Sequence, residues 1–417
     1  MLLATREVAA LIADRAFSRL WLVGLTSGIV RWLEVLAVGI FTFDVTGSPF
    51  LVALMTFLRM LPMALLGAVL GALFERLSLK TVLLVGLAAM TAVMAVLFAL
   101  AASGRIEIWH LALSALLGGV FWATDQPARR NMMGVIAGTE RVPQALSLDA
   151  ASNNVTRALG PMLGGLLLAA IGLTGALGIG LVLYAVAFAL MLTVPAQPPA
   201  ETSGRLNLWR DVGEGIALVR RDRALLGALA ITVVFNVWAF PYISMIPVIG
   251  RDDLGLGSFA IGLLMSAEGS GAFLGAVVVA LVARPLRYRQ IYYFGTLANL
   301  ALIAAFALSG EAWLSGLAVL VAGAGAGCFS SMQSTIIFLS APPRARSRLM
   351  GLLIVCIGTG PIGFLHLGWM ADLLGASMAT AVMAVEGLLA LLLVAIAWPV
   401  LRPLVATPSA APAGPGS

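Results

Sequence analysis

The sequence is poor in charged and in chemically reactive side chains. Only 11% of its 417 residues are charged, and it contains two histidines and two cysteines. Hydrophobic residues make up 61% of the chain, and its mean hydropathy is +1.04. A soluble domain needs a larger share of polar residues to cover its surface. The composition therefore excludes a water-soluble fold and indicates a protein embedded in lipid.

Several motifs that carry chemistry are missing as well. Cys328 and Cys356 lie in apolar segments without CxxC spacing, so we predict neither a disulfide nor a metal site. There is no HExxH, GxSxG or Walker A sequence, and the histidines, His110 and His366, lie far apart. We predict no enzymatic activity, no cofactor and no nucleic-acid partner. A membrane-embedded enzyme and a receptor or scaffold that transports nothing remain as rival classes.

Long apolar segments follow one another along the chain, separated by short polar clusters. A helix needs ~20 residues to cross the ~30 Å hydrocarbon core of a bilayer. Twelve segments meet this length, at residues 19–43, 49–75, 80–102, 107–132, 143–170, 174–195, 224–249, 258–283, 289–309, 312–338, 348–373 and 376–400. The sequence therefore predicts an all-α integral membrane protein with twelve transmembrane helices.

The basic residues are distributed unevenly between the two sides of these segments. With a cytoplasmic N-terminus, 20 of the 25 Lys and Arg residues fall on the cytoplasmic side, and only Arg105 and Arg251 fall on the other. This asymmetry is the positive-inside pattern of membrane proteins and places both termini in the cytoplasm. The first 18 residues are too charged to be a cleavable signal peptide, so we expect the first helix to be retained.

A polar interruption at 196–223 divides the chain into two halves, 1–195 and 224–401. Apolar residues recur in it at helical spacing between charged ones, which predicts a short amphipathic helix on the cytoplasmic membrane surface. The Pro- and Ala-rich tail, 402–417, is predicted to be disordered.

The two halves repeat a Gly-Pro pair in equivalent helices. Gly160-Pro161 lies in the fifth segment and Gly360-Pro361 in the eleventh, 200 residues further along. We therefore predict two pseudo-symmetric six-helix bundles. Such repeats place a cavity between them near the middle of the membrane, where secondary transporters bind substrate.

Two motifs resemble signatures of the major facilitator superfamily, and the resemblance covers nearly the whole chain. The sequence GALFERLSLK at 71–80 is similar to the loop signature GxLaDRxGRRx, with Glu75, Ser78 and Leu79 as departures. RALGPMLGG at 157–165 resembles the Gly-Pro signature of the exporters. Finer features, such as Thr46-Gly47-Ser48 and the RSRLMG sequence at 346–351, resemble the bacterial exporter group that contains the enterobactin exporter and macrolide efflux proteins.

The resemblance implies roles for both motifs. The first implies a cytoplasmic latch that pairs with Asp125 and with the helix beginning near Ser347. Its members are Gly71, Glu75, Arg76, Lys80 and Asp125. The second implies a hinge, although plain small-residue packing is the alternative. The hinge residues are Gly160, Pro161, Gly164 and Gly165.

Charged residues inside the predicted helices need partners, since an ionised group at mid-bilayer costs at least ~2.5–3.5 kcal/mol. Arg31 and Glu34 share one face of the first helix. Either they form a self-contained ion pair, or Glu34 takes up and releases a proton while Arg31 holds it ionised or receives an anionic substrate group. Glu268, in the eighth helix, is the second predicted proton-coupling residue. The superfamily places the fifth and eighth helices face to face, so we expect Arg157 to approach Glu268.

Further residues are predicted to line a substrate site. A surplus of buried Arg suits an acidic or polyphenolic substrate. The predicted substrate-binding residues are Arg31, Arg59, Asn153, Arg157, Asn236, Trp238, Tyr242, Gln333 and His366. Glu386 is expected to be structural or lipid-facing.

Taken together, these features predict a monomeric, proton-coupled exporter of a small organic or amphiphilic molecule in the bacterial cytoplasmic membrane. Its expected partners are the substrate, protons and the lipid bilayer. A flippase for lysolipids or similar lipids, and an importer of the same fold, are the alternatives.

Overall fold

A computed structural model describes residues 9–74, 78–196, 219, 222–341 and 346–397 of the chain. Most of the predicted linker 196–223, all of the tail 402–417, and the latch residues Glu75 and Arg76 lie outside the described residues.

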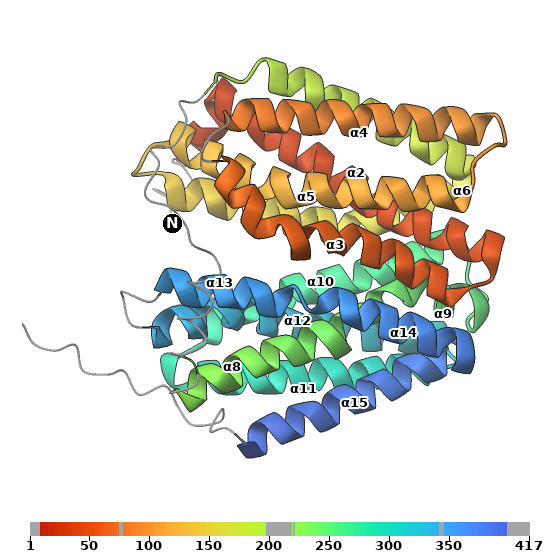
Figure 1. Cartoon of the computed structure of the whole chain (residues 1–417), viewed down its shortest axis with the longest axis vertical. Helices are drawn as coiled ribbons and strands as arrows, with labels where there is room; N and C mark the ends of the chain where they lie inside the picture. The colour runs from red at the N-terminus through yellow and green to blue at the C-terminus, as the bar shows by residue number, and fades with distance from the viewer. Residues whose placement is uncertain (1–8, 75–77, 197–218, 220–221, 342–345, 398–417) are drawn as a thin grey trace, which may run out of the picture.

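Five long helices make up most of the described N-terminal half, drawn from red to yellow-green in Figure 1. They are α2 (Arg15–Thr46), α3 (Pro49–Phe74), α4 (Leu79–Ala102), α5 (Ile108–Ala137) and α6 (Val142–Leu192). The side chain of Asp14 accepts hydrogen bonds from the amides of Ala16 and Phe17 and so caps the start of α2. Gly47, with a φ of 64°, ends that helix in the left-handed conformation.

The C-terminal half, drawn from green to blue, lies beside the first half with its helices roughly parallel to the others (Figure 1). Its α-helices are α8 (Arg223–Val234), α9 (Ile246–Asp252), α10 (Ser258–Val282), α11 (Tyr288–Ala307), α12 (Ala312–Ser340), α13 (Arg346–Ile357), α14 (Gly360–Leu374) and α15 (Ala376–Ala397). A π-helix, η1 (Phe235–Ala239), and two 3₁₀ helices, η2 (Phe240–Ser244) and η3 (Pro285–Arg287), complete it.

The all-helical fold predicted from the sequence is confirmed for the described residues, and their secondary structure contains no strand. Among them, nine helices are long and apolar enough to cross a membrane, and Pro49–Leu65 is a shorter apolar helix. By the criteria of helix length and apolarity, the described residues therefore do not give the twelve membrane-spanning helices that the sequence predicts. One reason is that α6 contains two predicted spans, joined at Gly172, where φ is 65° and ψ is −175°. A glycine tolerates this conformation without a steric penalty.

The predicted seventh span is the most irregular part of the described chain. The α-helical pattern of α8 passes into the π-helix η1, then into the 3₁₀ helix η2, and returns to an α-helix in α9. Pro241, in η2, and Pro247, at the start of α9, lack the amide hydrogen that a continuous helix requires. Residues 235–244 therefore form an interrupted segment between two regular helical ends.

Two large apolar cores hold the helices together. One consists of N-terminal residues alone, including Leu87, Met90 and Tyr184. The other is mainly C-terminal but also takes in Leu36 and Val52 from α2 and α3. The second core therefore continues across the boundary between the halves.

Candidate functional site

The two halves are joined by polar contacts at one end of the bundle, where α2 ends and α3 begins. We call it the Asp44 end. Arg251, on α9, donates to both carboxylate oxygens of Asp44 at 2.8 and 2.6 Å. Asp372, on α14, accepts from the amide of Phe50 at 2.9 Å and from the hydroxyl of Ser48 at 3.1 Å. We call the opposite end, where α2 begins and α5 finishes, the Arg130 end.

Helices α6 and α10 cross the boundary between the halves in direct backbone contact. A Cβ atom on Gly165 would lie 2.4 Å from the carbonyl oxygen of Ser258. One on Gly262 would lie 2.5 Å from the carbonyl oxygen of Pro161. No side chain fits at these points, so the glycines allow an approach that any larger residue would prevent.

The other small residues of the predicted hinge face α2. A Cβ on Gly160 would lie 2.7 Å from the Cβ of Trp32, and one on Gly164 would lie 3.1 Å from the Cα of Leu33. Pro161 lies inside α6, whose backbone leaves helical values only at Gly172. The glycines therefore serve close packing in this conformation, and the hinge stays a prediction.

A cavity of about 470 Å³ lies between the halves. Its volume is within the range of pockets that bind small molecules. Aromatic side chains from four parts of the chain form much of its wall, namely Trp122, Phe235, Phe240, Tyr242, Phe329 and Phe364. Its polar members are few, namely Gln126, Arg157, Asn236, Glu268, Asn299 and Ser330. The lining suits a largely apolar molecule held by a small number of directed polar contacts.

Arg157 and Glu268 form an ion pair in the cavity wall. The Arg157 Nη2 atom lies 2.6 Å from Glu268 Oε1, and its Nε atom lies 3.2 Å from Oε2. The arrangement is bidentate, which gives it both strength and a fixed orientation. Arg157 is on α6 and Glu268 on α10, so the pair bridges the two halves. The expected approach of these two residues is thus found in the structure.

Two further predicted substrate-binding residues line the same cavity, both on the interrupted segment 235–244. The Asn236 side chain donates to the carbonyl oxygen of Thr232 at 2.8 Å, which leaves its own oxygen free to accept. The Tyr242 hydroxyl is buried and has no hydrogen-bond partner among the described residues. Both side chains retain hydrogen-bonding capacity for a bound molecule.

Arg31, Glu34 and Arg59 lie inside the N-terminal half and do not line this cavity. Glu34 lies 3.5 Å from Arg59, and its carboxylate also accepts weak hydrogen bonds from Ser114 and Tyr184. Arg31 contacts Asp125 instead, at 3.7 Å. The pairing thus differs from the Arg31–Glu34 pair suggested by their spacing. A spacing of three residues fixes a shared face but says nothing about charges supplied by α3 and α5.

Arg31 is nevertheless one layer behind the cavity wall. Its guanidinium carbon lies 5.1 Å from the ring centroid of Trp122, and Trp122 lines the cavity. A cation at this distance is attracted to the face of the indole ring. A movement of Trp122 would therefore change the electrostatic environment of Arg31 and, through it, of the buried charges of the N-terminal half.

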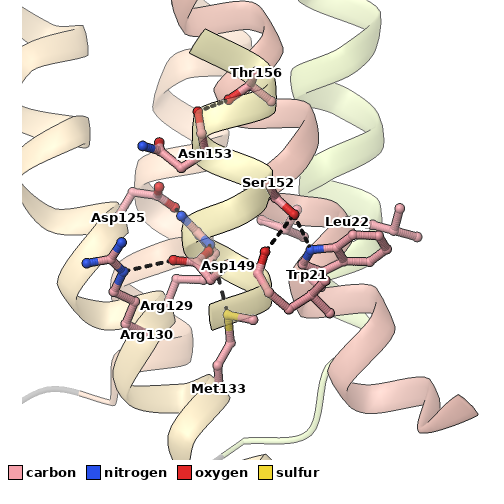
Figure 2. Close-up of polar contacts among 12 residues, drawn as sticks. Trp21, Leu22, Asp125, Arg129, Arg130, Met133, Asp149, Ser152, Asn153 and Thr156 are labelled. Carbon is pink, nitrogen blue, oxygen red and sulfur yellow. Dashed lines mark hydrogen bonds and ion pairs between the residues drawn. The ribbon is translucent and has the colours of Figure 1, made fainter. Parts of the chain in front are cut away.

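Figure 2 shows a second group of buried charges, on α5 and α6 near the Arg130 end. Asp149 accepts a hydrogen bond from Arg129 and another, at 2.8 Å, from Arg130. Arg129 also lies 3.6 Å from Asp125. These contacts continue the Arg31–Asp125 contact as a line of alternating charges. The role of Asp149 was not predicted, because its partners lie on a different helix.

Asn153 lies one turn beyond Asp149 on α6, beside this charged group and away from the cavity lining (Figure 2). Its carbonyl oxygen accepts from the Thr156 hydroxyl at 2.9 Å. Gln333, on α12, is also absent from the cavity lining, and its amide nitrogen is buried without a hydrogen-bond partner among the described residues.

The predicted latch is only partly within the described residues. Gly71 is the twenty-third residue of α3, and the Lys80 ammonium donates to the carbonyl oxygen of Leu192 at 3.0 Å. Asp125 is fully buried and contacts Arg31 and Arg129. The latch as a whole stays a prediction.

Trp238 and His366 also lie away from the cavity lining. Both contact Glu386, on α15: the Trp238 indole nitrogen at 3.0 Å and the His366 Nε2 atom at 2.9 Å. No group of three potential metal ligands is found among the described residues.

The aromatic wall of the cavity was not predicted from the sequence, apart from Tyr242. The rings of Phe235 and Phe329 stack with centroids 3.7 Å apart, and the Tyr292 ring stacks on Phe329 at 5.1 Å. In a chain with 18 phenylalanines, nothing in the spacing separates cavity residues from residues that face lipid. The one feature of the sequence that could have indicated a cavity residue is the position of Phe235 directly before Asn236, a predicted substrate-binding residue.

The chain is similar in sequence to known membrane transporters. Residues 7–410 match the sequence profile of the transmembrane secretion effector family. The chain is 26% identical over 302 residues to the MFS-type transporter YfiS of Bacillus subtilis strain 168, covering 70% of this chain and 69% of YfiS. It is 20% identical over 268 residues to macrolide efflux protein A of Streptococcus pyogenes, covering 64% of this chain and 66% of the efflux protein.

A solved structure of a mutant of the nucleoside transporter NupG superposes with a TM-score of 0.76. It is 13% identical and covers 92% of this chain and 100% of its own, so this likeness concerns the fold alone. The profile match extends over nearly the full length, and it shows a multi-pass membrane transporter rather than an enzyme. The chain therefore belongs to the transmembrane secretion effector family of major facilitator superfamily transporters.

Proposed function

We propose that the protein is a monomeric, proton-coupled exporter that moves a small amphiphilic organic molecule out of a bacterial cell by alternating access. The observation that carries this proposal is the Arg157–Glu268 pair, which bridges the halves and faces the cavity. Protonation of this pair, binding of a substrate to it and separation of the halves would all change the same Arg157–Glu268 contact.

The chemistry of the pair suits coupling. When Glu268 is ionised, it holds Arg157 and keeps α6 against α10. When Glu268 binds a proton, the ion pair is lost, and the carboxyl group can no longer hold a cationic group of a substrate. A proton and a cationic group of the substrate thus compete for the Glu268 carboxylate at the contact between the halves.

The proposed orientation places the Arg130 end in the cytoplasm. Arg15, Arg19, Lys80, Arg130 and Arg141 lie at that end, and the opposite end has Arg105 and Arg251. This distribution follows the positive-inside pattern. The contacts of Asp44 and Asp372 would then close the outer side in this conformation.

Export rather than import is supported by the Gly-Pro run of α6 and by the similarity to macrolide efflux protein A. The bacterial cytoplasmic membrane is supported by the bacterial origin of the relatives.

A lysolipid is the second candidate cargo. The predominantly apolar and aromatic cavity wall favours it, since an acyl chain needs such a lining. The ion pair would then meet a headgroup.

Transport in reconstituted vesicles tests the proposal. Purified protein is placed in liposomes with an imposed pH gradient, and the movement of a macrolide, an acidic siderophore and a lysophospholipid is followed. We expect gradient-driven movement of at least one probe, directed from the Arg130 end to the Asp44 end. Glu268→Gln should abolish the dependence on the gradient, because the glutamine cannot exchange a proton.

Glu311→Gln is the matched control, since Glu311 is exposed and lies before α12. It should transport as the wild type does. Gradient-driven movement that survives Glu268→Gln would overturn the coupling role, and movement in the reverse direction would overturn export.

A further inference from the structure

We propose that Glu386, His366 and Trp238 form a proton-binding site outside the cavity, and that this site sets the conformation of the interrupted segment 235–244. The three residues come from α15, α14 and η1. None of them lines the cavity, so the site is separate from the Arg157–Glu268 pair. The inference holds whatever molecule the protein carries.

The contacts converge on a single carboxylate oxygen. Glu386 Oε2 lies 3.0 Å from the Trp238 indole nitrogen and 2.9 Å from His366 Nε2. The Glu386 and His366 side chains are 37% and 35% exposed, so the site is open on one side. Glu386 is the eleventh residue of α15, about 15 Å from either end of that helix at ~1.5 Å per residue. An ionisable pair at this depth is costly, and such groups commonly mark functional sites.

Among the helices packed against α14 and α15, α3 has one charged residue, Arg59, which pairs with Glu34 in the N-terminal half. The charged groups of the other surrounding helices lie near the helix ends. Glu386 is the single charged residue of α15. The remaining charged residues of the packed elements α8, α9, α11 and α14 are Arg223, Arg251, Asp252, Arg289 and Asp372. Of these, Arg251 is bound to Asp44 and Asp372 to Ser48 and Phe50, at the Asp44 end.

The tyrosines of α11 are also distant from the site along their helix. Tyr288, Tyr292 and Tyr293 occupy its first two turns, and Tyr292 shares a hydrogen bond with the Thr232 hydroxyl at 2.8 Å. The α11 residue beside the site is Leu300, which approaches Gly387. His366 is therefore the titratable partner of Glu386.

Trp238 connects this site to the cavity. It belongs to the π-helix η1, and π-helical turns inside α-helices are frequent at functional positions. Its neighbours Phe235 and Asn236 line the cavity, as do Phe240 and Tyr242 of the same segment. One face of segment 235–244 therefore forms the cavity wall, and Trp238 holds another part of it to Glu386.

The proton changes how strongly Trp238 is held. An ionised Glu386 oxygen accepts hydrogen bonds from both Trp238 and His366. When the neutral His366 ring takes a proton, the pair becomes an imidazolium and a carboxylate, because imidazole is a stronger base than a carboxylate. The Glu386 oxygen then shares its charge with the imidazolium and becomes a weaker acceptor for the Trp238 indole, which can only donate. Segment 235–244 is thereby held less firmly, and with it the cavity wall.

Nuclear magnetic resonance in lipid nanodiscs tests this directly, because the chain has two histidines and nine tryptophans. The protein is labelled with isotopic histidine and with 5-fluorotryptophan. His110→Gln leaves His366 as the single histidine signal, and Trp238→Phe identifies the Trp238 signal by its loss. Both are followed from about pH 5 to pH 9, the range around the usual titration of histidine.

We expect the His366 and Trp238 signals to shift with a common midpoint. Glu386→Gln should remove the pH-dependent shift of Trp238, whereas Glu311→Gln and Glu268→Gln should retain it. A His366 signal that does not change over this range would overturn the proposal, as would a Trp238 signal that does not follow it. These two results need only the His110→Gln and Trp238→Phe proteins, so the test does not depend on the folding of the Glu386 variant.

Discussion

Buried carboxylates of the N-terminal half each have arginine partners on other helices. Glu34 contacts Arg59, and Asp149 contacts Arg129 and Arg130. Removing one member of such a pair leaves an uncompensated buried charge, whereas removing both does not. Comparing single and double substitutions therefore measures how much the unfolding free energy depends on leaving one charge without its partner.

The Glu34–Arg59 pair gives the first prediction. Glu34→Met should destabilise the protein by about 3–5 kcal/mol, since Arg59 keeps a buried charge without its partner. The double variant Glu34→Met, Arg59→Met should recover most of this loss. Thermal unfolding in one detergent measures both. Equal destabilisation in the single and double variants would show that the interaction between Glu34 and Arg59 does not contribute to stability.

Asp149 gives a second prediction at this scale. Asp149→Asn should lower the unfolding temperature, because Arg129 is buried and loses a charged acceptor. Glu140→Gln is the control, since Glu140 is exposed and should leave that temperature unchanged. An Asp149→Asn protein that unfolds at the wild-type temperature would contradict the assigned contacts.

Helix α6 meets α10 through glycines, and this contact defines how closely the halves approach. Gly262 has no room for a Cβ, because that atom would lie 2.5 Å from the Pro161 carbonyl oxygen. On α5, by contrast, a Cβ on Gly134 would meet nothing within 4 Å. A glycine-to-alanine substitution is the same chemical change at both positions, but the surroundings of the two positions differ.

Gly262→Ala should force α6 and α10 apart, at a cost of about 1–3 kcal/mol. It should also weaken the Arg157–Glu268 contact, because both residues lie on these helices. Unfolding temperature and vesicle transport should both fall. Gly134→Ala should change neither, and similar losses in the two variants would indicate that loss of glycine itself is responsible.

The helices differ in how far the sequence could predict them. Length and apolarity were enough to place α4, α10 and α15. They did not predict the interruption at 235–244, since Pro241 and Pro247 mark a weak point but not a π-helix. The Arg157–Glu268 contact was predicted because both helices were expected at the boundary between the halves. The partners of Glu34 and Asp149 were not, because hydropathy gives the depth of a residue and not the direction in which it faces.

The described chain forms two helical groups. They contact each other at the Asp44 end, along α6 and α10, and through the shared apolar core, and the cavity lies between them. Asp44→Ala should favour separation at the Asp44 end, since the partly exposed pair with Arg251 is worth about 0.2–1 kcal/mol, a shift in population of roughly 1.4- to 5-fold. The charge exchange Asp44→Arg, Arg251→Asp should reverse the effect. Spin labels at Ser103 and Met378, in a background without Cys328 and Cys356, measure it. Unchanged distances in Asp44→Ala would show that this pair does not hold the halves.

The central claim is that the halves alternate around the cavity under control of Glu268. Distances across both ends of one protein test it most directly, with spin labels at Ser103 and Met378 for the Asp44 end and at Val135 and Leu339 for the Arg130 end. In Glu268→Gln, which mimics the protonated state, we predict that the first distance lengthens while the second shortens. Distances that both stay at their wild-type values, or that change in the same direction, would contradict the account.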